Sequence, residues 1–81
     1  MPSVARRPYV VAGNYRQFLL YCREKGIGMD GATFVHDRYR IMGIPRDSEV
    51  IFTGTYQDRY DMDDIRTELR HRGIDWRVDP L

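Results

Sequence analysis

The chain has 81 residues, of which 42% are hydrophobic and 31% are charged, and its 13 basic and 12 acidic side chains leave a formal net charge of +1. A chain of this length forms one domain with a small core, and its near-neutral charge excludes the global field that attracts nucleic acid or anionic lipid. No stretch approaches the roughly 20 apolar residues of a membrane span, so we expect no membrane partner. The single Cys22 cannot form an internal disulfide, which fits a cytoplasmic protein.

The first segment, Met1–Pro8, carries two arginines, and no apolar run follows that would make it a signal peptide. We interpret residues 1–8 as a flexible basic tail and residues 9–81 as a single α/β domain. The domain begins with Tyr9–Ala12. Its continuous apolar character is typical of a strand that is covered on both faces, as in parallel sheets.

A helix is predicted over Tyr15–Lys25. Asn14 can cap its first turn, and Gln17 stands at the third helical position, as in a capping box. Gly26 suits the left-handed position after a helix, and Ile27 can fold back as its apolar partner. The apolar side chains recur at i, i+3, i+4 and i+7, which places them on one helix face: Tyr15, Phe18, Leu19 and Cys22.

A second strand is predicted over Ala32–His36, which completes a strand–helix–strand unit. Residues 37–43 allow two interpretations. Asp37 can cap a short helical turn that directs Ile41 and Met42 inward, or the segment can alternate as another strand. The turn is favoured, because a connection to a parallel strand needs a crossover rather than a hairpin.

The third strand is predicted over Glu49–Thr53. Asp61 stands where it can cap a second helix, Met62–Arg72, whose acidic start and basic end match the helix dipole. Residues 74–79 alternate between apolar and polar side chains and predict a half-exposed edge strand that ends at Pro80.

The two halves of the domain repeat one pattern. An apolar run, a glycine, a small polar residue and a tyrosine occur in Tyr9–Tyr15 and again in Val50–Tyr56, and a helix follows each copy. With right-handed crossovers, these units predict a small α/β three-layer sandwich: a parallel four-stranded sheet of order 2-1-3-4 with two main helices on opposite faces. Strands 1 and 3 are then neighbours, and ligands of open α/β sheets bind beyond the carboxyl ends of such strands.

The crevice between the two glycine turns is therefore the candidate ligand site. Its residues are Gly13, Asn14, Tyr15, Arg16, Gly54, Thr55 and Tyr56. The first turn can offer helix amides and the Arg16 cation to a phosphate, and the tyrosines can stack on a base. A simpler interpretation is that the glycines only let the chain leave a strand and that Asn14 only caps a helix.

Other chemistry lacks the residues that it needs. The chain has neither a G-x-x-x-x-G-K-[S/T] loop nor a G-x-G-x-x-G turn. One cysteine and two histidines give no zinc spacing, and no serine stands at a strand-to-helix elbow. His36 with Asp37 is the best acid–base pair, although an exposed histidine beside a helix cap explains it more simply. We therefore expect no enzyme, no metal and no cofactor.

Two surface features concern macromolecular partners. Trp76 and Val78 on the edge strand form the candidate interface, where Trp76 either covers the core or contacts another subunit. Three arginines surround Tyr39 at positions 38, 40 and 46. Carboxylates interleave with these arginines, which argues against nucleic-acid binding.

The phrases Ala-Gly-Asn-Tyr-Arg-Gln-Phe and Thr-Gly-Thr-Tyr, the short length and the excess of arginine over lysine resemble small uncharacterised α/β proteins of bacteriophages that infect high-GC actinobacteria. The resemblance covers Tyr9–Ile74. Such proteins are similar in layout to Rossmann-like or P-loop-like cores without a phosphate loop. The resemblance implies an accessory protein of the bacterial host cytoplasm and supplies no catalytic residues.

We predict a small non-enzymatic module that binds a protein partner or a second copy of itself. The small core, the missing catalytic residues and the edge strand favour this function. The alternative is a Rossmann-like domain that binds a nucleotide or another small phosphate-bearing ligand between the glycine turns.

Overall fold

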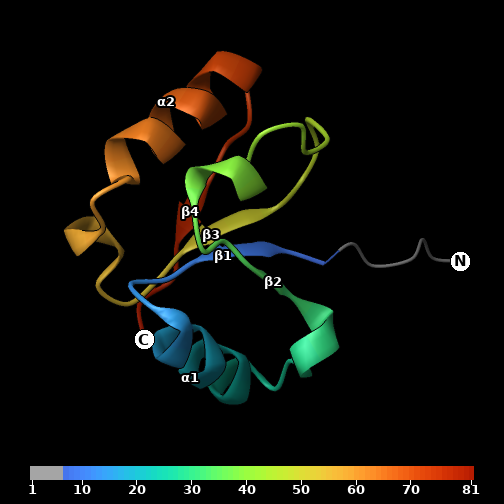
Figure 1. The fold of residues 1–81 in the computed structure, drawn as a ribbon. Coiled ribbons are helices and arrows are strands. Elements are labelled where there is room, and N and C mark those ends of the chain that lie inside the picture. Colours follow the sequence, from blue (N-terminus) through green and yellow to red (C-terminus); the bar gives the residue numbers. More distant parts are fainter. Residues whose placement is uncertain (1–6) are drawn as a thin grey trace, which may run out of the picture.

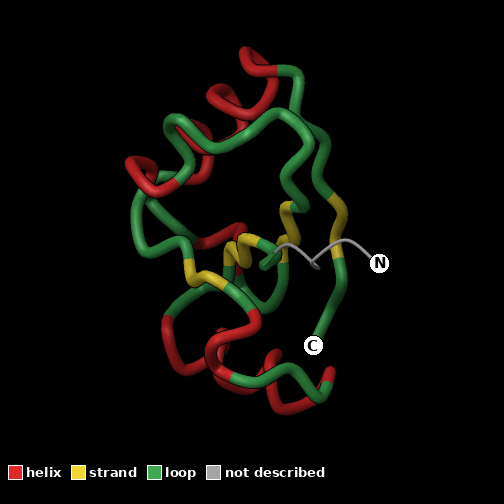
Figure 2. The backbone as a smooth tube through the Cα atoms, turned by 90° about the vertical axis from the view of Figure 1, so that its right-hand side faces the viewer, coloured by secondary structure: helices red, strands yellow, loops and turns green. Residues whose placement is uncertain are grey.

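The computed structural model describes residues 7–81 and arranges them in three layers, with a sheet between two helical layers (Figures 1 and 2). The four strands are all parallel and follow the predicted order β2-β1-β3-β4. Their bounds are β1 Tyr9–Val11, β2 Thr33–Phe34, β3 Val50–Phe52 and β4 Arg77–Val78. Residues 1–6 of the predicted tail lie outside the described residues. The Pro8 carbonyl accepts a hydrogen bond from the Thr33 amide (2.9 Å), next to the β1–β2 pair.

Both helices span the predicted residues, α1 Tyr15–Lys25 and α2 Met62–Arg72. Each ends at a left-handed glycine, Gly26 or Gly73, with φ of 68° and 71°. The isoleucine that follows each glycine donates its amide back to the helix: Ile27 to the Cys22 carbonyl and Ile74 to the Leu69 carbonyl. This closure confirms the stop signal that the two copies share.

The core divides at the sheet, because neighbouring residues of one strand point to opposite faces. Val10 and Ile51 belong to the cluster on the α1 side, whereas Val11 and Phe52 belong to the cluster on the α2 side. The residues of α1 that are buried are Phe18, Tyr21 and Cys22, and those of α2 are Met62, Ile65 and Leu69. Tyr15, predicted on the buried face of α1, is 49% exposed at the first turn.

The segment of residues 37–43 forms the short helical turn rather than a strand. It contains the 3₁₀ turn η2, Arg38–Arg40, whose Tyr39 amide donates to Asp37 Oδ1 (2.9 Å). Ile41 is fully buried, as predicted, but Met42 is 50% exposed, so its predicted inward position is wrong. Successive residues of a helical turn point in different directions, and only one of the two can face the core. The other 3₁₀ turns are η1 Met29–Gly31 and η3 Tyr56–Asp58.

Candidate ligand crevice and exposed sheet edge

The two glycine turns lie side by side, because β1 and β3 are parallel neighbours and end at the same rim of the sheet. The side chain of Gln17 bridges the turns. Its Oε1 accepts hydrogen bonds from the amides of Gly13 (3.0 Å) and Thr55 (2.9 Å), and its Nε2 donates to Thr55 Oγ1 (3.0 Å). The Gln17 amide N–H donates to Asn14 Oδ1 (2.9 Å), which confirms the predicted cap. Asn14 therefore caps α1, and the Gln17 side chain occupies the space of the predicted crevice.

Close packing accounts for both glycines. A Cβ on Gly13 would overlap Thr55 Oγ1 and Gln17 Oε1, and a Cβ on Gly54 would overlap Gln17 Oε1. Gly54 also has a φ of +62°, which disfavours any other residue. The requirement for glycine at these two positions needs no ligand to explain it.

The two tyrosines of the candidate site lie on different sides of the sheet. Tyr15 contacts the Phe18 and Phe34 rings, with centroids 5.7 and 5.5 Å away, beside α1. Tyr56 is buried in the α2-side cluster, 5.2 Å from the Phe52 ring. They form no common stacking site. Arg16, the predicted cation, is exposed on α1.

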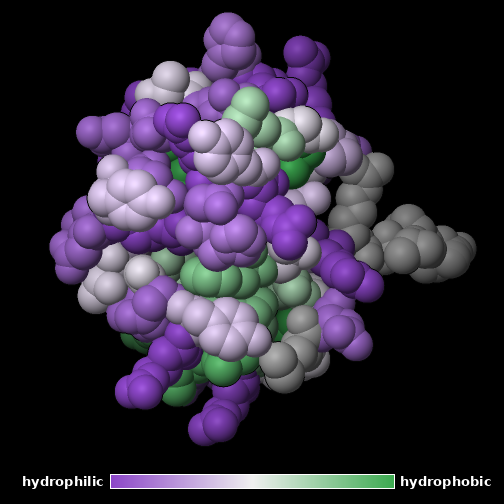
Figure 3. All heavy atoms as spheres, in the orientation of Figure 1, coloured by the Kyte–Doolittle hydropathy of each residue, from purple (hydrophilic) through white to green (hydrophobic). Residues whose placement is uncertain are grey.

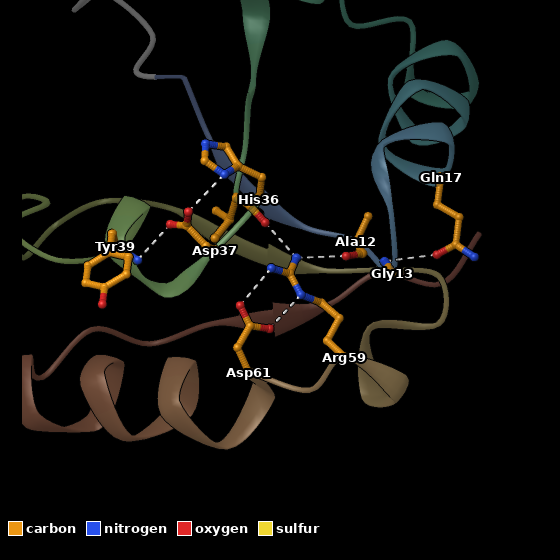
Figure 4. A network of polar contacts seen from close by, with 9 residues as sticks. Ala12, Gly13, Gln17, His36, Asp37, Tyr39, Arg59 and Asp61 are labelled. Atoms are coloured by element: carbon orange, nitrogen blue, oxygen red, sulfur yellow. Dashed lines mark hydrogen bonds and ion pairs between the residues drawn. The ribbon is translucent and has the colours of Figure 1, made fainter.

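A buried arginine that the sequence did not indicate lies at the same rim (Figure 4). Arg59 precedes α2, and its side chain is 7% exposed. Its Nη1 donates to the carbonyls of Ala12 (2.9 Å) and Val35 (2.6 Å), the residues that follow β1 and β2. Its Nε and Nη2 donate to the two carboxylate oxygens of Asp61 (3.0 and 3.1 Å). One guanidinium therefore donates to two carbonyls at the ends of neighbouring strands, where a ligand of this fold class would bind.

Asp61 was predicted to cap α2, but its side chain makes no capping hydrogen bond. Its carboxylate is only 3% exposed and binds Arg59 instead. That part of the prediction is wrong. The Asp61 backbone carbonyl still accepts the first helical hydrogen bond, from the Ile65 amide (3.0 Å).

The acid–base candidate occupies an open position. His36 Nδ1 lies 3.1 Å from Asp37 Oδ2, with side chains 59% and 33% exposed, while Asp37 caps η2. This arrangement matches the simpler interpretation of the pair. Within residues 7–81, no group of three or more His, Cys, Asp or Glu residues could hold a metal ion. In the same range, no helix has the length and apolar character needed to cross a membrane.

A second surface lies between η2 and α2, and it includes Arg38 and Tyr39 of the arginine-rich segment that the sequence indicated. Two hollows of about 280 and 290 Å³ share Arg38, Tyr39 and Asp64 among their lining residues. Arg38 forms an ion pair with Asp64 of α2 (3.1 Å). Tyr39 is 63% exposed, and Tyr60 at the rim of the second hollow is 93% exposed. In Figure 3 the surface over these elements is mostly hydrophilic, and the more hydrophobic side chains gather over α1 and β2.

Strand β4 lies at the margin of the sheet, near the end of the described chain (Figure 2). Trp76 stacks on the Phe52 ring, with centroids 5.3 Å apart and planes inclined by 14°. The Arg70 guanidinium lies over the Trp76 ring at 5.7 Å. Trp76 therefore covers one end of the core, whereas Val78, two residues further along the strand, is 51% exposed.

The outer edge of β4 presents backbone groups of Trp76 and Val78. The Asp79 amide donates to the Phe52 carbonyl (2.9 Å), which shows that Asp79 directs its backbone groups toward β3. The backbone groups of successive residues alternate in direction along a strand, so those of Arg77 also face β3. Those of Val78, and of Trp76 just before the strand, face outward. Among the described strands, β4 pairs with β3 alone. Its edge is therefore open to another strand.

A polar network fastens β4 to α1. The Tyr21 hydroxyl donates to Asp79 Oδ2 (2.8 Å), and Lys25 Nζ lies 3.3 Å from Asp79 Oδ1. Burial, together with the hydrogen bond and negative charge of Asp79, raises the pKa of Tyr21 to about 12. The hydrogen bond from Tyr21, followed by Lys25, lowers the pKa of Asp79.

This network predicts a loss of stability at alkaline pH. A raised pKa means that the folded state prefers the neutral phenol, so the contribution of Tyr21 is complete below its unfolded pKa of about 10 and disappears as the pH rises through about 12. Between about pH 10 and pH 12, the urea midpoint of Tyr21→Phe should fall less steeply with pH than that of the wild type. Tyr60→Phe, on a 93% exposed side chain, is the matched control and should keep the wild-type slope. Equal slopes for Tyr21→Phe and wild type would contradict the prediction.

Comparison of the chain with models of protein families, with curated proteins and with solved structures gives no match.

Proposed function

We propose that the protein is a small non-enzymatic binding module that recognises an extended protein segment by strand addition at the outer edge of β4. It would be an accessory protein of the kind that the phage resemblance implies. The observation that carries the proposal is the unpaired outer edge of β4. The backbone groups of Trp76 and Val78 point outward there, and the Val78 side chain is half exposed. In this mode the backbone hydrogen bonds supply affinity and the flanking side chains supply specificity.

The filled rim of the sheet favours this function over ligand binding. Gln17 bridges the glycine turns, and Arg59 binds the carbonyls of Ala12 and Val35. The turn amides and the carbonyls at the carboxyl ends of these strands, where a ligand of this fold class would bind, are thus engaged with the chain itself. The edge of β4 has no such internal partner among the described strands.

A displayed peptide library tests the proposal. Val78→Pro removes the outward amide of Val78 but leaves the inward groups of Arg77 and Asp79 available to β3. We expect the wild type to enrich peptides of high strand propensity and Val78→Pro to enrich none of them. Tyr60→Ser, on the distant surface beside α2, is the control and should behave as the wild type.

Circular dichroism melting would show that each variant is folded. Enrichment of the same peptides by Val78→Pro, or no enrichment by the wild type, would contradict strand addition at this edge.

Nucleotide or phosphate binding at Gly13–Arg16 stays a prediction. A ligand there would have to displace the amide group of Gln17 and its hydrogen bonds to both turns. A nucleotide that raises the melting temperature of the wild type, but not of Arg16→Ala, would favour it again.

A further inference from the structure

The geometry of β4 points to one particular occupant of its edge. We propose that a second copy of this chain binds there, with the two β4 strands antiparallel and Val78 on the two-fold axis. This inference rests on the proposed function and names its partner.

The outward backbone groups restrict the pairing. Trp76, Val78 and Pro80 are alternate residues, and their backbone groups point away from β3. In an antiparallel pair these groups must face outward-pointing backbone groups of the second copy. Four symmetric registers give Val78 an outward partner: Trp76 faces its own copy, Trp76 faces Val78, Val78 faces its own copy, or Val78 faces Pro80. The last of these places Asp79 opposite Asp79, two like charges, and is unfavourable.

The first two registers are unfavourable. With Trp76 on the axis, Asp75 would face Arg77, an opposite charge, but Val78 would face Ile74. The Ile74 amide already donates to the Leu69 carbonyl (2.9 Å), and Ile74 is only 2% exposed, so this residue cannot pair with the second copy. With Trp76 opposite Val78, Arg77 would face Arg77 and Asp75 would face Asp79. Like charges directly opposite each other destabilise a strand pair.

The third register matches charges and apolar side chains. With Val78 on the axis, Arg77 of each copy lies opposite Asp79 of the other, on one face of the pair, and Trp76 lies opposite Pro80 on the other face. Pro80 has no amide N–H, so each Trp76–Pro80 position forms one backbone hydrogen bond, and the Val78–Val78 position forms two. Val78 is 51% exposed and would be covered by its own symmetry mate. Arg77 already contacts Glu49 (2.7 Å) and has donors left for Asp79 of the second copy.

The size of the edge sets the expected affinity. Stable interfaces bury about 1,200–2,000 Å² in total, and a strand as short as Arg77–Val78 offers less than that on its own. We therefore expect a monomer–dimer equilibrium that depends on protein concentration. A closed two-fold pair joins both sheets into one and leaves no outer β4 edge for further growth.

Charge exchange is the sharpest test. Arg77→Asp and Asp79→Arg each place like charges in both Arg77–Asp79 positions of a homodimer, so sedimentation should show each dimer weakened about tenfold or more. Mixing the two variants restores opposite charges in both positions, and a heterodimer near wild-type affinity should form. Two weakened variants that fail to associate when mixed would overturn the register.

Cysteine crosslinking keeps the test valid if Asp79→Arg unfolds by losing its contacts with Tyr21 and Lys25. Val78→Cys places two thiols in a directly opposed pair, about 5.5 Å apart between Cα atoms, which a disulfide can span. Arg77→Cys thiols would lie diagonally and beyond that reach. A disulfide dimer from Val78→Cys alone supports the axis, and equal crosslinking by Tyr60→Cys overturns it.

The outcome also separates this inference from the proposed function. A wild type that stays monomeric at its highest attainable concentration, while displayed peptides still bind in a manner sensitive to Val78→Pro, overturns self-association and leaves strand addition standing. If Val78→Pro changes neither peptide binding nor self-association, both strand addition at the β4 edge and the proposed dimer are overturned.

Discussion

Replacing Arg59 by methionine is expected to lower the free energy of unfolding by about 3–5 kcal/mol. The change leaves the Asp61 carboxylate, 3% exposed, without its cation. It also removes the donor that binds the Ala12 and Val35 carbonyls. A domain of this length has a total stability of roughly 4–12 kcal/mol, so the variant should lose much of it. Urea unfolding followed by circular dichroism measures the loss.

Two further variants separate the causes. Arg66→Met removes an arginine of α2 whose partner Asp63 is 3.7 Å away and fully exposed, and it should cost less than about 1 kcal/mol. Arg59→Met combined with Asp61→Leu removes the buried charge as well and should recover part of the loss. What remains should be near the lower end of the cost of two unpaired carbonyls, about 2 kcal/mol in total.

The result bears on function as well as on stability. A cost for Arg59→Met no larger than that for Arg66→Met would mean that water reaches Asp61 and the strand ends. The rim of the sheet would then be open, and the ligand-binding alternative would regain its site. A large cost means that the chain itself completes the rim, which favours recognition at the β4 edge.

The fold could be predicted because its determinants are local. The bounds of α1 and α2 follow from apolar periodicity and from the glycine–isoleucine stops, all within about a dozen residues of sequence. The strand order followed from the duplicated unit and the handedness of parallel crossovers, which leave few arrangements for four strands. Both are confirmed.

The contacts at the rim could not be predicted, because they join residues that are far apart in the sequence. Arg59 binds carbonyls 24 and 47 residues away, and its own segment has no periodic pattern. Gln17 was placed correctly as a cap partner, but its reach to Thr55, 38 residues away, depends on the exact approach of two turns. Asp61 had two credible partners, the helix start and Arg59, and only the fold decides between them.

Gly54→Ala is expected to lower the free energy of unfolding by about 2–3 kcal/mol. A left-handed φ of +62° costs an alanine about 1–2 kcal/mol, and its Cβ would force the Gln17 amide away from the turn amides of Gly13 and Thr55. Urea unfolding again gives the value. We expect Gly54→Ala to lower the free energy of unfolding more than either Gly73→Ala or Gly13→Ala.

The chain offers a control for each cause. Gly73 has a φ of +71° and no atom within 4 Å of an added Cβ, so Gly73→Ala should show the backbone strain alone, about 1–2 kcal/mol. Gly13 has no left-handed φ, so Gly13→Ala should show the displacement of Gln17 and Thr55 alone. In the background of Gln17→Ala, Gly54→Ala should cost no more than Gly73→Ala. If Gly54→Ala matches Gly73→Ala in the wild-type background, Gln17 does not fill the space between the turns in solution, and that space is free for a ligand.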